Sequence, residues 1–580
     1  MTREFLSPHC SSWSFRSNFS FSGGTGVSGT NLNKFDVAST VTASPLDSDS
    51  TLGFYETVQS PLPTVYEQRV NYQSRRSLAL LINYFAAGLF HGVVPALVYP
   101  LFKIRLGLQG YQTNATQTLL GCAWHGKLVL CLLTDCVPIG GRRRISYIYI
   151  GWTLVLFILG LMMILHPDGR DIGDAPRLIF MITVASVGHL LVDAACDGLM
   201  VEAVNRDSQL QERGVLHGAN LSQTAVHAAR FIAESMGTLL VAVGMNSEEY
   251  SGGFSFEMSL RGLFAVLLVA ALAALCAAVW GFGKPCIIRT EVASDTSSIS
   301  VATPNLRSKL GEFWHIMQQR ATWQIASFGF LQKLSLSFGM DSAPHSQAIH
   351  ELWLHTDPFM KNLFLALANG GVSVAASVFV HRRLLSTSWH SSVCIALLGG
   401  LIVGFPVAMV AVFDIWRSKF FFLVATEMVG FADCIAMMVR MFVVVEIAEP
   451  GFESSTYGLV TSVYNLADPV ATALSNAIGS YLQVFDADIQ RDADDVRVRA
   501  GALFAVLFTV RAVVGLGALP LLPNQRHDAR QLKARGGSCK RMGLTVFLTI
   551  GASFSVALVA CILSVFQSTS CLRLAGGVGC

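Results

Sequence analysis

Acidic and basic side chains recur inside long apolar segments of this chain. The segment 176–200 carries His189, Asp193 and Asp197, and steps of four residues place them on one face of a helix, one turn apart. A charge at bilayer depth costs roughly 2.5–3.5 kcal/mol on insertion scales, so it is normally paired, directed into a cavity or functional. A buried carboxylate beside a histidine can take up a proton near neutral pH. The stripe therefore indicates either a structural ion-pair network or a proton relay.

The next apolar segment, 217–243, carries a second polar stripe. Its members share one face of the expected helix: Gln223, His227, Arg230 and Glu234. The loop between the two segments is short, so the two stripes can face each other. We expect Arg230 to pair with Asp193 or Asp197. The charges on the two stripes outnumber what one structural pair needs, which favours a proton-coupled carrier.

Further charged residues lie inside other apolar segments. Lys127, near the middle of its segment, is either a partner for an acid of the 176–200 stripe or a contact for an anionic substrate. Lys333 and Arg511 occupy corresponding depths in the second half of the chain. Asp433 and Arg440 are seven residues apart on one helix face, and we interpret them as a structural pair.

The segment 457–482 combines a polar stripe with a proline. The stripe consists of Thr461, Asn465, Asp468 and Thr472. Pro469 removes a backbone hydrogen bond there. A polar stripe with a break at membrane depth indicates a cavity wall, and a hydrogen-bonded seam between helices is the alternative.

The stretch 135–144 joins two apolar segments through a proline, two glycines and three consecutive arginines. The glycines permit a tight turn, and the arginines keep it on the cytoplasmic side. Asp135 at the helix end has three guanidinium groups within reach. The stretch is either a turn that fixes topology or a clamp that gates a rocking transporter. The clamp residues would be Asp135, Gly141, Arg143 and Arg144.

The composition sets the class of protein. Of 580 residues, 52% are hydrophobic and 14% are charged, and the mean hydropathy is +0.51. Soluble domains carry about a quarter charged residues, so a polytopic, all-α membrane protein is expected. The thirteen cysteines show no metal-binding spacing, and no nucleophile elbow or phosphate loop is present, so we expect neither an enzyme nor a metal or cofactor site.

Twelve apolar runs are long enough to cross a bilayer, six on each side of a polar stretch. They are 78–102, 115–134, 146–165, 176–200, 217–243, 259–283, 322–338, 359–380, 391–413, 419–446, 457–482 and 501–522. A thirteenth run, 543–566, follows. The resulting domains are a disordered cytoplasmic tail (1–68), a six-helix bundle (75–283), a cytoplasmic linker (284–320), a second six-helix bundle (321–522), and a basic loop with a C-terminal helix and tail (523–580).

Two further patterns support this layout. Matched motifs recur at an offset of roughly 240 residues, which indicates two homologous halves. The connections richest in Lys and Arg place the N-terminus in the cytoplasm. If the thirteenth run spans the membrane, Cys571 and Cys580 lie outside and could form a disulfide. Gly88 and Gly92 have the small-x-x-x-small spacing of close helix contacts.

Four motifs, in the same order, resemble the folate–biopterin transporter family, a branch of the major facilitator superfamily. They are Asp135-x-x-Pro138-Ile139-x-Gly141-x-Arg143-Arg144, Asp193-x-x-x-Asp197 with Glu202, the stretch from Phe442 through Glu446 and Glu453 to Leu466, and the ending Ser568 to Gly577, which is similar to one divergent branch. The resemblance covers roughly residues 75–580. One departure is Ser454, where the family usually has glycine.

The resemblance implies a major-facilitator carrier for pterins, folates or related metabolites, coupled to protons. Folate carboxylates would give a counter-charge role to Lys127, Arg230, Lys333 and Arg511. Two alternatives remain open: transport of another organic solute, such as S-adenosylmethionine or a nucleoside-like metabolite, or a receptor or scaffold that does not transport. The expected partners are a small substrate, protons and lipids, with no nucleic acid. The plasma membrane is the default location, and an organelle membrane stays open.

Overall fold

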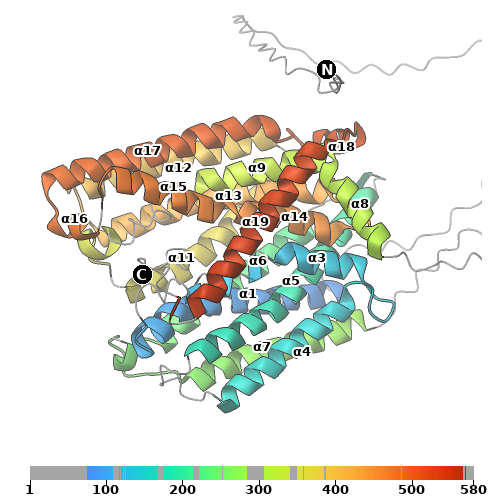
Figure 1. Cartoon of the computed structure of the whole chain (residues 1–580), viewed down its shortest axis with the longest axis horizontal. Coiled ribbons are helices and arrows are strands. Elements are labelled where there is room, and N and C mark those ends of the chain that lie inside the picture. Colours follow the sequence, from blue (N-terminus) through green and yellow to red (C-terminus); the bar gives the residue numbers. More distant parts are fainter. Residues whose placement is uncertain are drawn as a thin grey trace, which may run out of the picture. The chain divides into compact units, whose positions relative to one another are not determined.

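The structure is a computed structural model. It describes residues 75–108, 116–117, 119–121, 123–124, 126–165, 175–212, 221–250, 252–283, 306–339, 349–356, 358–384, 387–484, 486–565 and 568–569. The expectations for the tail 1–68 and for a Cys571–Cys580 disulfide lie outside these residues. The regular elements of the described residues are helices, as the composition predicts (Figure 1).

The N-terminal half contains the first group of helices. They are α1 (Arg75–Leu97), continued by the π-helix η1 (Val98–Arg105), then α3 (Lys127–Cys136), α4 (Ile145–Leu165), α5 (Ala175–Glu212), α6 (Leu221–Gly244), the short η3 (Glu248–Tyr250) and α7 (Leu260–Phe282). Helix α1 packs against α6 and α7, α4 packs against α5 and α7, and α3 packs against α5. These contacts bring the two predicted polar stripes, on α5 and α6, to the same side of α1.

The C-terminal half repeats the arrangement. Its elements are α8 (Leu306–Gln318), α9 (Arg320–Leu336), η4 (Ile349–Trp353), α11 (Pro358–Phe379), η5 (Val380–Leu384), α12 (Trp389–Val412), α13 (Lys419–Ile447), α14 (Glu453–Asn465), α15 (Ala467–Tyr481), α16 (Asp486–Arg491), α17 (Asp494–Ala518), η6 (Leu519–Leu521), α18 (Arg526–Ala534) and α19 (Lys540–Val565). Helix α12 packs on α13 and α17, and α9 packs on α14 and α17. The two halves meet where α6 contacts α11 and where α14 contacts α3 and α5.

Eight helices of the described residues are long and apolar enough to cross a membrane. They correspond to eight of the predicted spans, and the chain is a multi-pass membrane protein. Among the other predicted spans, α9 has only 17 residues, and the 457–482 run is divided between α14 and α15. Helix α8 lies inside the stretch that we expected to be a linker.

The break between α14 and α15 has a local cause. Helix α14 ends at Asn465, and α15 begins at Ala467. Pro469 has no N–H to donate to the carbonyl of Asn465, four residues earlier, so the helical ladder cannot continue there. The predicted break is confirmed, and it lies within the polar stripe of this segment.

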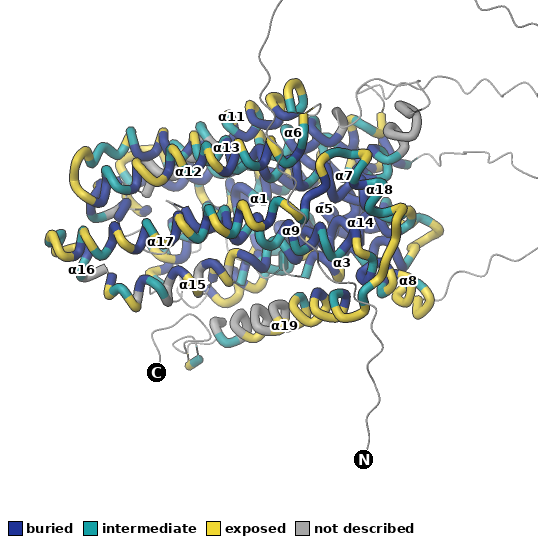
Figure 2. Tube along the Cα trace, turned by 90° about the horizontal axis from the view of Figure 1, so that it is seen from above, coloured by how far each residue is buried: buried dark blue, intermediate teal, exposed yellow. Residues whose placement is uncertain are grey.

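The C-terminal helix α19 is peripheral. It packs against α8, where the rings of Trp314 and Phe547 meet edge to face at 6.1 Å, and makes fewer contacts with α9 and α14. Figure 2 shows that much of its described part is exposed, including Leu544 and Leu548. Whether this helix crosses the bilayer stays a prediction.

Two glycines allow α1 and α6 to approach closely. A Cβ atom on Gly88 would overlap the carbonyl oxygen of Arg230, and one on Gly92 would overlap that of Glu234. The predicted close helix contact is therefore confirmed. It also sets the depth at which two charged residues of α6 face α1.

We predict that Gly92→Ala lowers the melting temperature of the purified protein. Overpacking of a tight contact typically costs 1–3 kcal/mol, roughly the cost of separating the two backbones here. The control is Gly160→Ala on α4, where a Cβ meets nothing within 4 Å and should give about 0.5–1 kcal/mol of stabilisation. Thermal unfolding followed by tryptophan fluorescence checks both. Equal melting temperatures for wild type and Gly92→Ala would contradict the prediction.

Candidate functional site

Four charged or polar residues from different helices surround two carboxylates in the N-terminal half. Lys127 Nζ lies 2.7 Å from Asp193 Oδ2 and 2.6 Å from Asp197 Oδ2. Arg230 Nη1 donates to Asp193 Oδ1 at 2.9 Å, and the Tyr84 hydroxyl donates to Asp197 Oδ1 at 2.7 Å. Both carboxylates are buried. We call these five residues the N-terminal cluster; it contains two cations and two anions.

The cluster decides between the interpretations of its members. The predicted Arg230–Asp193 pair is confirmed, and Lys127 is the partner of the acids on α5. The expectation of surplus charge is wrong for these two acids, because each carboxylate faces a cation. Their part in proton coupling stays a prediction.

The two predicted histidines of this half occupy apolar surroundings. His189 donates through Nε2 to the carbonyl of Ala87 at 3.1 Å, and its ring stacks on Phe90 with centroids 5.7 Å apart. His227 is buried beside the Tyr84 ring, and its Nε2 has no hydrogen-bond partner among the described residues. Neither imidazole contacts the carboxylates of the N-terminal cluster directly.

Glu234 is placed differently from the acids of α5. Its Oε1 lies 3.7 Å from Nε2 of His91 on α1, and both side chains are about one-third exposed, at 34% and 31%. The His91 ring in turn meets Trp124 edge to face at 4.9 Å. His91 was missed by sequence reasoning because a single histidine in an apolar run carries no spacing signal.

Trp124 connects these groups. Its ring centroid lies 5.3 Å from Lys127 Nζ and 5.5 Å from the guanidinium carbon of Arg230. An aromatic face with cations at this distance is a favourable electrostatic arrangement. Nothing in the sequence distinguishes this tryptophan from the many aromatic residues of membrane helices.

A second group of polar residues lies where α9 meets the break between α14 and α15. Lys333 Nζ pairs with Asp468 Oδ1 at 3.0 Å, and the Ser337 hydroxyl donates to the same oxygen at 2.6 Å. The Tyr464 ring centroid lies 5.3 Å from Lys333 Nζ. Asn465, predicted as a site residue, is half-buried at the end of α14. The structure therefore brings Lys333 and Asp468 together.

The predicted pair Asp433–Arg440 is wrong. Asp433 Oδ1 accepts from Arg511 Nη2 at 2.5 Å, so α17 supplies the cation for α13. Residues seven apart on one helix are separated by roughly 10 Å along its axis, and a neighbouring helix offers a closer partner. Arg440 instead donates to Gln332 Oε1 at 3.1 Å.

The predicted gating stretch forms an ion-pair cluster that joins the two halves. Arg144 Nη2 contacts Asp135 Oδ1 at 2.8 Å and Glu453 Oε2 at 2.6 Å, while Nη1 contacts Glu202 Oε2 at 2.9 Å. The other oxygen of Asp135 accepts from the Ser455 N–H at 2.7 Å and from its hydroxyl at 2.9 Å. We call these five residues the cytoplasmic clamp. Three of them belong to the N-terminal half and two to α14.

The other predicted members of the stretch do not pair with Asp135. Arg143 is exposed, and Arg142 donates to the carbonyl of Gly283. Of the three arginines, Arg144 is the one that binds the acid, because it is the one buried beside it. Gly141 has a φ of 73°, in the left-handed region that favours glycine, which confirms the tight turn.

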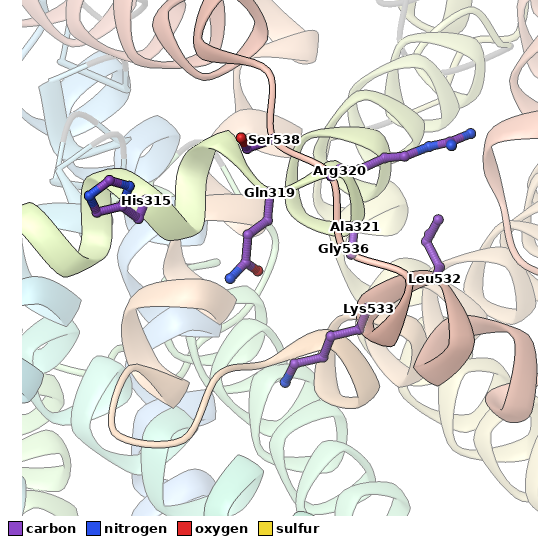
Figure 3. Close-up of a pocket in the computed structure, with 9 residues that line it drawn as sticks. His315, Gln319, Arg320, Ala321, Leu532, Lys533, Gly536 and Ser538 are labelled. Atoms are coloured by element: carbon purple, nitrogen blue, oxygen red, sulfur yellow. The ribbon is translucent and has the colours of Figure 1, made fainter.

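A cavity of about 390 Å³ lies apart from these groups, between the start of α9 and α18. Figure 3 shows Gln319 and Lys533 reaching into the same space while Arg320 points away. None of the predicted site residues lines it.

Comparisons with known proteins agree with this architecture. The model of the BT1 family matches residues 87–526. A folate-biopterin transporter from Synechocystis sp. is 24% identical over 486 residues, covering 80% of this chain and 85% of that protein. A probable folate-biopterin transporter 4 from Arabidopsis thaliana is 30% identical over 124 residues, covering 21% of this chain and 24% of that protein. The solved proton:xylose symporter XylE, at 13% identity, gives a TM-score of 0.53 and covers 80% of this chain and 98% of that chain.

The fold is therefore that of the major facilitator superfamily, in an all-helical, multi-pass membrane protein. This class consists of transporters and not of enzymes. The chain belongs to the BT1 family, whose model matches most of its length. The resemblance drawn from four sequence motifs is confirmed.

We predict that Lys127→Met strongly destabilises the protein, because Asp193 and Asp197 lose their shared cation in a buried site. Breaking a buried pair costs roughly 3–5 kcal/mol. The double variant Lys127→Met/Asp197→Asn should recover part of the loss. Lys309→Met, which breaks the exposed pair with Glu312, is the control and should cost at most about 1 kcal/mol. Melting temperatures in detergent check the order, and a double variant no more stable than the single one would contradict it.

The cytoplasmic clamp should be insensitive to mild acid. Burial opposes the charged form of Glu453, but Arg144 and backbone N–H groups outweigh it, so the pKa of this carboxyl is lowered. A lowered pKa means that its stabilising contribution is complete above the ordinary value near 4.5 and is lost only as the pH falls below it. Stability measured between about pH 5 and pH 8 should therefore depend equally on pH in wild type and Glu453→Gln. A difference in slope within that range would contradict the assignment.

Proposed function

We propose that this protein is a secondary active transporter of folate, biopterin or a related pteridine, coupled to protons. Membership of the BT1 family and the printed function of its Synechocystis relative support the substrate class. The observation that carries the proposal is the pair of aromatic rings flanked by cations, Trp124 in the N-terminal half and Tyr464 in the C-terminal half. A planar heteroaromatic ring can stack on such faces, and the cations attract its anionic groups.

The cations next to these rings are held in defined positions. Lys127 and Arg230 are fixed by Asp193, and Lys333 is fixed by Asp468. Counter-charge roles for these cations and for Arg511 belong to the proposal. A substrate carboxylate would then share each cation with its resident acid.

Alternating access requires contacts between the halves that can close one side. The cytoplasmic clamp supplies them, and the Ser454 hydroxyl adds a bond to the carbonyl of Ala194 at 2.7 Å. The ion pairs on the opposite side join residues of one half, such as Arg105 with Glu257 and Arg417 with Asp492. This distribution supports a state closed toward the cytoplasm and a rocking motion that opens the clamp.

Within the proposal, Glu234 is the best-placed proton carrier. Its partner, His91, can be neutral, whereas the acids of α5 face Lys127 and Arg230, which keep their charge. Protonation of Glu234 therefore strands no permanent cation. Its partial exposure also gives a path for protons. Residence in the plasma membrane is part of the same proposal.

The test is uptake of labelled folate and biopterin by a host that lacks its own carrier, at about pH 5.5 and about pH 7.5. Wild type should take up at least one compound faster at the lower pH. Glu234→Gln should reduce this pH difference at least tenfold, and Glu248→Gln, in the short η3 helix, should keep it. Competition by S-adenosylmethionine or a nucleoside, with none by pterins, would indicate the alternative cargo. No uptake of any of these compounds would favour a receptor.

A further inference from the structure

Arg440 on α13 is a buried cation without a carboxylate partner. Four cationic side chains of the described residues are almost fully buried: Lys127, Arg144, Arg440 and Arg511. The other three pair with acids at 2.5–2.9 Å. Within the described part of the chain, no acid forms an ion pair with Arg440, which is 1% exposed, and its Nη2 has no hydrogen-bond partner.

The guanidinium of Arg440 is nevertheless held firmly. Its Nη1 donates to Gln332 Oε1 at 3.1 Å, and Gln332 Nε2 donates to the carbonyl of Ala436 at 3.1 Å, which fixes the direction of the amide. The guanidinium carbon lies 3.4 Å from the Tyr464 ring centroid. Gly329 on α9 leaves room for the arginine stem, since a Cβ there would contact Arg440 Cδ at 3.4 Å.

An oriented but unpaired cation is costly in a buried site, because desolvation is not repaid by an opposite charge. The surroundings add to the imbalance. Lys333 shares the Tyr464 ring with Arg440, and Asp468 is the acid that pairs with Lys333. Two cations therefore meet one carboxylate at this ring, which leaves a place for one more negative charge.

We propose that Arg440 binds a carboxylate group of the transported substrate. The unused Nη2 donates to the incoming carboxylate, while Gln332 and Tyr464 hold the guanidinium plane in place. A guanidinium matches the planar geometry of a carboxylate and cannot be neutralised by losing its proton. The inference rests on the proposed function and makes it specific: Arg440 distinguishes substrates that carry a carboxylate, such as folate, from pterins that carry none, such as biopterin.

Transport kinetics of Arg440→Gln provide the first test. The KM for folate should rise roughly 10- to 100-fold, the loss expected for a hydrogen bond to a charged group. The ratio of folate to biopterin in kcat/KM should fall by at least about tenfold. Arg383→Gln, in the exposed η5 segment, is the matched control and should leave that ratio unchanged. An equal loss for both compounds, or no loss for folate, would overturn the proposal.

Thermal unfolding without substrate provides a second test that needs no transport. Arg440→Met removes the unpaired charge and keeps an apolar stem of similar length, so its melting temperature should be above that of wild type. The stabilisation of wild type by added folate should be absent from this variant. A melting temperature below wild type would show a structural role and overturn the proposal. If wild type transports neither compound, the proposed function fails, while this comparison still decides on Arg440.

Discussion

A charge buried among membrane helices must lie within a few ångströms of an opposite charge. This constraint governs how the helices of this protein meet. Lys127 ties α3 to α5, Arg230 ties α6 to α5, and Arg511 ties α17 to α13. Each pair joins elements that apolar contact alone could hold in several rotations, because one apolar face packs much like another. The pairs therefore select one arrangement, and the remaining apolar surface fills in around them.

The sequence predicted much of this arrangement. Apolar runs longer than about 20 residues require spanning helices, and their grouping around a polar stretch gave the two halves. A spacing of four residues placed Asp193 and Asp197 on one face, and a short loop put Arg230 opposite them. Pro469 located the helix break because the missing N–H has a fixed consequence four residues earlier. In each case the relevant physics is local to one helix or to two neighbours.

The errors share a different origin. Asp433 and Arg440 have a spacing that fits a pair, yet their partners come from α17 and α9, which are distant in sequence. Helical periodicity says which residues share a face but not which helix covers that face. His91 and Trp124 were missed for the same reason, since their significance comes only from the groups packed beside them. Composition likewise shows that α19 is apolar, without showing what it packs against.

The cytoplasmic clamp has an asymmetry in how its charges are distributed. Arg144 has two acids in its own half, Asp135 and Glu202, and one, Glu453, in the other. When the halves part, the arginine stays neutralised where it is, and the glutamate moves into water, which solvates it well. The latch thus releases without leaving a bare ion in an apolar environment, and the barrier to switching comes mainly from the two hydrogen bonds of Ser455. A hydroxyl and an amide, and not the strongest charges, hold the door.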